Sequence, residues 1–337
     1  MSPRSSRRSW LASGVALCLS GALASVPASA QSQSQSQADS YPTRPVTLIN
    51  PYAAGGPADT LARALAHALE PLLGQAVIVD SKAGGAATIG TGFVARAKPD
   101  GYTLLVSTSA GHVVTPLMQR VPYDGVADFA FIAVVANQPN VLVVNAGLGV
   151  GTLQELIAMA RKEPDRLNYA SAGTGGATHL GAEAFLKRAG IRVTHVPYPG
   201  AAPALKDVLG GQVQMAMLNL AATQPFIEQG KLKALAYGAA KRSPLLPQVP
   251  TLAEAGFGGA EVSTWYTLSA PRGTPPAVVE RLRKAVAQVN ADPAYQKLLA
   301  AQGAERMDLS PAQTTAFVQR DKEAMTALLG TLNLLDK

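Results

Sequence analysis

The chain has 337 residues, with 29 basic and 22 acidic side chains, a formal net charge of +7 and a single cysteine. One cysteine can form neither a disulfide within the chain nor a cysteine metal site. The basic residues are dispersed and aromatic residues make up only 5% of the chain, so a nucleic-acid-binding surface is not expected.

Residues 1 to 30 have the layout of a secretory signal peptide, which is a basic start, an apolar run and a small-residue cleavage site. These parts are, in order, Arg4, Arg7 and Arg8, then residues 10–23, then Ala28-Ser29-Ala30. We therefore expect export to the periplasm and cleavage near Ala30, with the Sec and twin-arginine routes both open. Cleavage would remove Cys18 and leave a mature chain without a thiol.

Residues 31–40 begin with alternating glutamine and serine, which bury no apolar surface, and are expected to form a disordered linker. Removal of the three arginines of the signal reduces the 29 basic residues to 26 against 22 acidic ones, a mild net charge of +4. Beyond residue 30 no run approaches the ~18 apolar residues that a membrane-spanning helix needs. The remaining length is enough for two lobes.

After the linker, strands alternate with helices, and each strand ends in a loop of small residues. Strands are predicted at 46–50, 76–79 and 102–106, followed by loops at 52–59, 81–88 and 107–111. A helix at 60–73 carries Leu61, Leu65, Leu69 and Leu72 on one face and stops at Gly74. Repetition of strand, loop and helix predicts an α/β fold with parallel strands whose loops gather at one end of the sheet.

The loop at 171–178 is the strongest candidate for binding. It contains Gly173, Gly175 and Gly176 between a strand at 167–171 and a helix at 177–189. The amides of a first helical turn lack intrahelical partners and lie at the positive end of the dipole, so they favour an anion. The glycines approach the dinucleotide fingerprint, but no acidic residue stands about 20 positions later, which disfavours NAD. A plain tight turn is the remaining alternative.

A second series of elements follows and suggests a second lobe. It consists of capping boxes at Thr152 and Thr251, strands at 193–197, 215–218 and 232–237, a loop at 219–223, and tail helices starting at Thr274-Pro275, Asp292-Pro293 and Ser310-Pro311. Valine-rich segments at 141–144 and 262–269 bracket this series and are predicted to cross between lobes. Residues 41–141 and 265–337 would then form lobe 1, and residues 142–264 lobe 2, with a ligand cleft and a hinge between them.

Seven stretches, in the same order, carry a resemblance to a known family: PYAAGGPAD (51–59), AKPDGYTL (97–104), SAGTGGATHL (171–180), VPYPG (196–200), GGQ (210–212), PTLAEAG (250–256) and APRGTP (270–275). Nearly end to end, the mature chain is similar to the periplasmic solute-binding receptors of tripartite tricarboxylate transporters, the Bug (TctC) family. The resemblance implies a two-lobed type II binding-protein fold, each lobe a sheet flanked by helices. It also implies that backbone amides and ordered waters of loops 52–59 and 171–178 hold a carboxylate.

The chain departs from the family pattern in several places. Residues 81–88 read SKAGGAAT where the family usually has Asn-Arg-Pro-Gly-Ala-Gly-Gly-Asn, and Pro199 stands where lysine is frequent. Gln214 and Asn219 occupy positions that are often acidic or Asp-Asn-like. The resemblance therefore implies a shared carboxylate anchor and an altered distal part of the pocket. No particular member's ligand is carried over.

The predicted ligand-binding residues lie in the loops of both series: Tyr52, Ala53, Gly55, Gly56, Pro57, Ala58, Asp59, Ser107, Ser109, Ser171, Gly173, Thr174, Gly175, Gly176, Ala177, Thr178, Tyr198, Gly200 and Asn219. Asp59 is expected to cap a helix more than to touch an anion, which it would repel. His179 is expected either to brace the loop or to touch the ligand, and Tyr266 to pack at the hinge. No histidine spacing matches a zinc pattern.

The function predicted is capture of a small carboxylate (a di- or tricarboxylate, an acidic amino acid or an aromatic carboxylate) for delivery to the integral-membrane subunits of a tripartite tricarboxylate-type transporter. The receptor is expected to be a monomer that uses no metal and no cofactor and binds no nucleic acid. The alternative is an α/β hydrolase or dehydrogenase acting on a small carboxylate. An enzyme needs a base with an orienting partner near a nucleophile, whereas these loops offer almost only glycine, alanine, serine and threonine.

Overall fold

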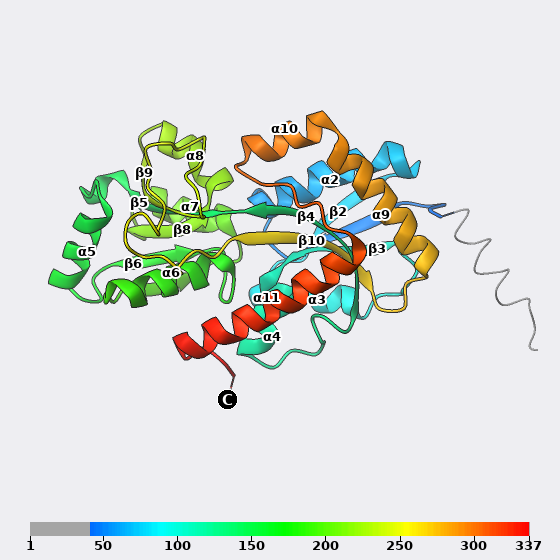
Figure 1. The fold of residues 1–337 in the computed structure, drawn as a ribbon, viewed down its shortest axis with the longest axis horizontal. Helices are drawn as coiled ribbons and strands as arrows, with labels where there is room; N and C mark the ends of the chain where they lie inside the picture. The colour runs from blue at the N-terminus through cyan, green and yellow to red at the C-terminus, as the bar shows by residue number, and fades with distance from the viewer. Residues whose placement is uncertain (1–40, 337) are drawn as a thin grey trace, which may run out of the picture.

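The computed structural model describes residues 41–336, so the predicted signal peptide and linker lie outside the described residues. These residues form two mixed sheets of five strands, each flanked by helices (Figure 1). We call each sheet with its helices a lobe. This is a two-lobed α/β architecture, as predicted.

The first lobe is built on a sheet with the strand order β2-β1-β3-β10-β4. Its strands are β1 (Val46–Asn50), β2 (Val77–Ser81), β3 (Thr103–Thr108), β4 (Phe129–Gln138) and β10 (Thr264–Pro271). Its helices are α2 (Pro57–Leu73), α3 (Thr88–Ala95), α4 (Thr115–Met118), α9 (Pro276–Ala291), α10 (Pro293–Ala301) and α11 (Pro311–Leu332). Strands β1, β2 and β3 are parallel, so their carboxyl ends lie at the same end of the sheet. Leu61, Leu65 and Leu69 of α2 are fully buried in its core.

The second lobe is built on a sheet with the order β7-β6-β8-β5-β9. Its strands are β5 (Asn140–Asn145), β6 (Asn168–Ser171), β7 (Thr194–Pro197), β8 (Met215–Asn219) and β9 (Leu232–Gly238), and its helices are α5 (Leu153–Lys162), α6 (Ala177–Ala189), α7 (Ala201–Leu209) and α8 (Leu220–Glu228). Strands β6, β7 and β8 are parallel. Apolar clusters cover both sheet faces, one with α5 and α6 and the other with α7 and α8.

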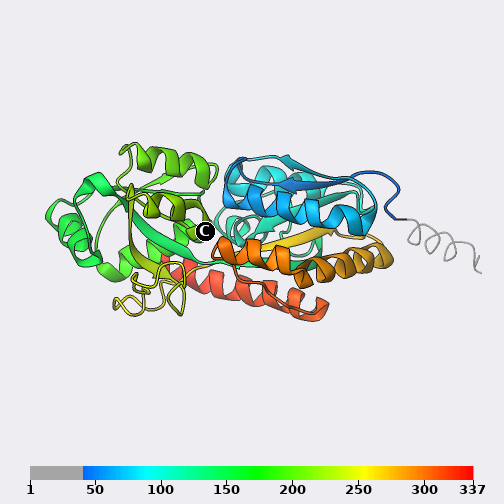
Figure 2. The same ribbon diagram turned by 90° about the horizontal axis from the view of Figure 1, so that it is seen from above.

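The chain crosses between the lobes twice, once at Pro139 between β4 and β5 and once through residues 239–263 between β9 and β10. Asn140 links the crossings because its side-chain amide donates to the carbonyl oxygen of Val262 over 2.6 Å. Figure 2 shows α11 running along the first lobe toward the second, where Lys187 of α6 donates to the carbonyl oxygen of Thr331. The lobe boundaries at 141/142 and 264/265 remain predictions.

Local signals explain several helix starts. Thr152 and Ser310 form the expected capping boxes, and Asp292 caps α10. Helix α2 begins three residues earlier than predicted because Pro57 is favoured at the first helical position. Within the tail, Thr274 was the wrong cap: its hydroxyl donates to the carbonyl oxygen of Pro271, and α9 begins after Pro275.

One further expectation in the second lobe was wrong, and one was confirmed. Residues 219–223 were predicted as a loop, but helix α8 starts at Leu220, and Pro225 is accommodated inside it. At the second capping box, Thr251 and Glu254 exchange the expected bonds between side chain and backbone. The chain there forms turns and no helix. A capping box satisfies amides of one turn, and it does not by itself continue a helix.

Candidate functional site

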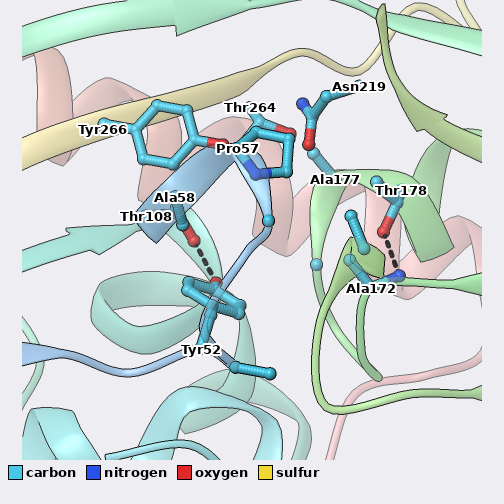
Figure 3. Close-up of a pocket in the computed structure, with 14 residues that line it drawn as sticks. Tyr52, Pro57, Ala58, Thr108, Ala172, Ala177, Thr178, Asn219, Thr264 and Tyr266 are labelled. Carbon is cyan, nitrogen blue, oxygen red and sulfur yellow. Dashed lines mark hydrogen bonds between the residues drawn. The ribbon is translucent and has the colours of Figure 1, made fainter. Parts of the chain in front are cut away.

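A cavity lies between the lobes, at the carboxyl ends of the parallel strands. It is lined by Tyr52, Ala53, Gly56, Pro57, Ala58, Thr108, Ala172, Gly176, Ala177, Thr178, Ala201, Asn219, Thr264 and Tyr266 (Figure 3). Ligands of open α/β sheets bind in such crevices outside the strand ends. The cavity measures only about 30 Å³, which is room for roughly two water molecules.

Four helices start at this cavity. Gly56, Gly176, Gly200 and Asn219 are the residues that precede the first turns of α2, α6, α7 and α8, respectively. Each of these helices contributes its start or its cap to the lining. First-turn amides carry partial positive charge and lack intrahelical partners, and α2 comes from one lobe while the other three come from the second. The lining contains no charged side chain, so the electrostatic character of the cavity comes from these amides.

The glycine loop before α6 has a defined shape that leaves its last amides available. The Thr178 hydroxyl accepts a hydrogen bond from the amide of Ala172 over 3.0 Å, as Figure 3 shows. The amide of Gly176 donates to the carbonyl oxygen of Gly173 over 3.2 Å. Because Ala177 and Thr178 are the first two residues of α6, their amides have no intrahelical acceptor. They are therefore free to donate to an anion in the cavity.

Hydroxyl groups complete the polar lining on the first-lobe side. Tyr52 and Thr108 share a hydrogen bond of 2.6 Å between their hydroxyl oxygens (Figure 3). Burial raises the pKa of Tyr52 to about 12, although the bond to Thr108 opposes the shift. Burial also raises the pKa of Tyr266. Both phenols therefore stay neutral at physiological pH and place no negative charge beside a bound anion.

The lobes touch directly next to the cavity. The amide of Ala53, in the first lobe, donates to the carbonyl oxygen of Pro199, in the second, over 3.0 Å. A Cβ atom at Gly56 would lie 3.8 Å from the amide nitrogen of Ala201, so the starts of α2 and α7 are in close contact. This structure therefore has a closed cleft.

A second cavity, of about 190 Å³, adjoins the first and shares Tyr52 and Ala172 with it. It is lined by Pro51, Tyr52, Gly84, Gly85, Ala86, Ala87, Ala172, Gly173, Thr174, Pro197, Tyr198 and Pro199. Residues 84–87 all have positive φ, which is strained for the two alanines. This loop is the segment that departs from the family pattern, and no charged side chain lines this cavity either.

The structure distributes the predicted site residues over three environments. Tyr52, Ala53, Gly56, Pro57, Ala58, Gly176, Ala177, Thr178 and Asn219 line the first cavity. Gly173, Thr174 and Tyr198 line the second. Gly55, Asp59, Ser107, Ser109, Ser171, Gly175 and Gly200 line neither. Their role in binding remains a prediction that no contact in the structure supports directly.

Asp59 lines neither cavity and organises the first-lobe loop. Its carboxylate accepts hydrogen bonds of 3.0 Å from the amide of Gly55 and from Nε of Arg63. Burial alone would raise its pKa, but the bonds from Arg63 and Gly55 outweigh burial and the net pKa shift is downward. Asp59 is therefore ionised and already compensated, which is a structural role, but it lies inside the first turn of α2 and the cap is Gly56, so the expectation that Asp59 caps the helix was wrong.

In the row Ser107-Thr108-Ser109, where β3 ends, the middle residue reaches the cavity. Ser107 is fully buried, and Ser109 donates to the carboxylate of Asp321 on α11 over 2.5 Å. Thr108, between them, lines the cavity. Successive side chains of a strand point to opposite faces, and that alternation is the signal that would have selected Thr108.

Four other lining residues were not predicted: Ala172, Ala201, Thr264 and Tyr266. Ala172 and Ala201 carry no chemical signal in the sequence, because only their place in a loop or helix start brings them to the cavity. Thr264 and Tyr266 lie on β10, which enters the cavity only because the chain returns to the first lobe there. Tyr266 was predicted to pack at the hinge. It lies on β10, the strand that follows the second crossing, and it also lines the cavity.

Neither a metal site nor a membrane span is found in the part of the chain that the structure describes. Among residues 41–336 no three histidine, cysteine or acidic side chains are placed to hold a metal ion. None of the helices within those residues combines the length and the apolar character needed to cross a bilayer.

Comparison with known proteins yields one family and several solved structures. The model of the "tripartite tricarboxylate transporter family receptor" matches residues 61–334. The structure of the periplasmic binding protein BugD is 36% identical, with a TM-score of 0.85 over 88% of this chain and 100% of its own. A Rhodopseudomonas palustris protein solved with adipate is 36% identical, with a TM-score of 0.84 over 87% of this chain and 98% of its own. MatC from the same species, solved with malate, is 30% identical, with a TM-score of 0.82 over 86% of this chain and 100% of its own.

Proposed function

Because this chain belongs to the family of tripartite tricarboxylate transporter receptors, we propose that it captures a small carboxylate, of the linear dicarboxylate class, in the closed cleft between its lobes. The family consists of periplasmic binding proteins, and two relatives were solved with the dicarboxylates adipate and malate. We propose the same class of ligand for this chain, together with signal-peptide-directed export and delivery of the ligand to membrane subunits of a transporter.

The observation that carries this proposal is the convergence of four helix starts on an uncharged cavity. A carboxylate accepts several hydrogen bonds, and amides at helix starts are donors that need no counter-ion. Micromolar capture requires about 8 kcal/mol. Four or five such bonds, at roughly 1.5 to 3 kcal/mol each, supply that after the cost of association.

The second cavity suggests where the rest of the ligand lies. It continues from the first past Tyr52, so a linear ligand anchored at Ala177 would extend toward residues 84–87. A dicarboxylate would meet backbone amides and the Thr174 hydroxyl there, and no cationic side chain. With this lining, selectivity depends on the length and shape of the ligand's carbon chain more than on pairing of charges.

Ser171 and His195 resemble a catalytic pair, but they give little support to the hydrolase alternative. Ser171 and His195 share a hydrogen bond of 2.7 Å, as a nucleophile and its base would. Ser171 is fully buried, however, and lines neither cavity. A nucleophile must reach its substrate, so we assign this pair a structural role.

The proposal is tested by thermal shift with a panel of mono-, di- and tricarboxylates, each paired with its neutral amide. A ligand at 100 times its dissociation constant adds about 2.7 kcal/mol to the stability of the folded state. We expect stabilisation by at least one linear dicarboxylate, such as adipate or malate, and none by the matching diamide. Equal shifts from acid and amide, or no shift with any acid, would contradict the proposal.

Ligand binding is also expected to close the lobes. The closed contact between Ala53 and Pro199 leaves a first cavity too small for a dicarboxylate to enter from solvent, so the empty protein must open to admit one. Small-angle scattering should therefore give a smaller radius of gyration with saturating adipate than without it. An unchanged radius, with binding confirmed by calorimetry on the same sample, would indicate a rigid pocket.

A further inference from the structure

The loop that forms the second-lobe half of the cavity is held by a histidine behind it. The amide of Gly175 donates to Nδ1 of His179 over 3.1 Å. The ring of His179 is only 4% exposed and lines neither cavity. Because Nδ1 accepts this bond, His179 is a neutral imidazole with its proton on Nε2.

His179 is itself fixed by a column of stacked rings. Its ring lies 4.2 Å from that of His195, which lies 4.7 Å from that of Tyr169, both with an interplanar angle of 18°. Ser171 holds His195 through their hydrogen bond of 2.7 Å, and the Tyr169 hydroxyl donates to Glu183 over 2.5 Å. The column thus joins β6, β7 and α6 behind the loop and leaves the His179 ring little freedom to turn.

The residue that His179 holds is the point at which the loop reaches the other lobe. Gly175 has a φ of 74°, and a Cβ atom there would lie 3.3 Å from side-chain atoms of Val114, Thr115 and Met118 in the first lobe. The next residues along the chain, from Gly176 to Thr178, line the cavity. A shift at Gly175 would therefore move both the interlobe contact and the amides that face the ligand.

We propose that His179 is a positioning residue, whose Nδ1 fixes Gly175 so that the free amides of Ala177 and Thr178 face the ligand when the lobes close. It does not touch the ligand, and its role in binding rests on the proposed carboxylate-binding function. Without an acceptor at this place the buried amide of Gly175 is left unsatisfied, which costs free energy until the loop rearranges.

Three variants separate this role from general stability. In His179→Asn, the side-chain oxygen Oδ1 is bonded to Cγ, as Nδ1 is in histidine, so a hydrogen-bond acceptor is kept at that position. His179→Gln moves its amide one bond farther out and lacks an acceptor at that place, and His179→Leu has none. The Asn and Gln variants lose the same stacked ring, so a difference between them reports the hydrogen bond to Gly175.

The first readout is amide hydrogen exchange of residues 172–178 in the empty protein, which requires no ligand. We expect fast exchange at Gly175 in the Leu and Gln variants and protection close to wild type in the Asn variant. Exchange at Gly175 that is equally slow in all four proteins would overturn the inference, whether or not wild type binds a carboxylate.

The second readout is the dissociation constant for adipate, or for malate if wild type does not bind adipate, measured by calorimetry well below each melting temperature. We expect roughly 10- to 100-fold weaker binding for the Leu and Gln variants, with affinity largely restored in the Asn variant. A Leu variant that binds as tightly as wild type would overturn the inference and leave the proposed function intact. A wild type that binds no carboxylate would instead refute the proposed function, and the exchange data would still decide the role of His179.

Discussion

Ala177→Asp is expected to leave the melting temperature of the empty protein nearly unchanged or slightly raised and to abolish stabilisation by ligand. Ala177 is the first residue of α6 and lines the cavity. An aspartate in a first turn is favoured by the helix dipole by about 0.3 to 1 kcal/mol. The same carboxylate would occupy the amides that a ligand needs and would repel its charge.

Thermal shift with saturating adipate measures both halves of this prediction. With ligand at 100 times the dissociation constant, the free energy of unfolding of wild type should rise by about 2.7 kcal/mol. That of the aspartate variant should not change. Ala177→Ser, which is small and neutral, should keep binding, and Ala177→Asn, which has the shape of aspartate without its charge, should lose less than aspartate does. Unchanged affinity in the aspartate variant would show that residues 173–178 are only a turn.

The second large effect is expected from pH. Burial lowers the pKa of His112 to about 4, although the bond to the Gly125 carbonyl opposes the shift, and burial together with the neighbouring His195 lowers the pKa of His179 to about 3. Unfolded histidine has a pKa near 6.5, so below that pH the unfolded chain binds protons that the folded protein does not. The stability contributed by neutral burial is therefore complete above pH 6.5 and is lost as pH falls toward 4.

Compared with a pH well above 6.5, each of these two histidines is expected to lower the free energy of unfolding at pH 5 by about 2 kcal/mol. Denaturant unfolding at pH 7, 6 and 5 measures the slope, and in this range few carboxylates titrate. His179→Asn should make the slope shallower. His67→Gln, which replaces an exposed histidine on α2, is the matched control. A wild-type stability that does not vary between pH 7 and 5 would contradict neutral burial.

Sequence patterns predicted the scaffold of this protein well because they act locally. The helix from Ala177 to Ala189 and the strand from Val46 to Asn50 have the predicted bounds, since glycine, proline and apolar periodicity mark both ends. At residues 219–223 a loop was predicted in place of the start of helix α8, which contains Pro225. Inside the helix it removes one amide donor, and the packing of Leu220 against the second-lobe core compensates.

The candidate site was predictable in its loops and less so in its individual side chains. Residues 176–178 were selected because a glycine loop before a helix has a physical reason to bind an anion, and residues 56–58 because the family resemblance implied them. Tyr266 and Thr264 belong to a strand that reaches the cavity from far along the chain, and Asn140 connects both crossings. The hydrogen bond of 3.4 Å from the Thr264 hydroxyl to the Asn140 side chain depends on that return. Such contacts follow from topology, which no local pattern encodes.

The central claim, that helix starts from both lobes hold a carboxylate, is tested most directly by a crystal structure of the protein with the dicarboxylate that stabilises it most. We expect one carboxylate of the ligand between α2 and α6, within hydrogen-bonding distance of the amides of Ala58, Ala177 and Thr178, with its chain directed past Tyr52 toward residues 84–87. A ligand whose carboxylates lie away from these amides, or that binds outside the two cavities, would contradict the account.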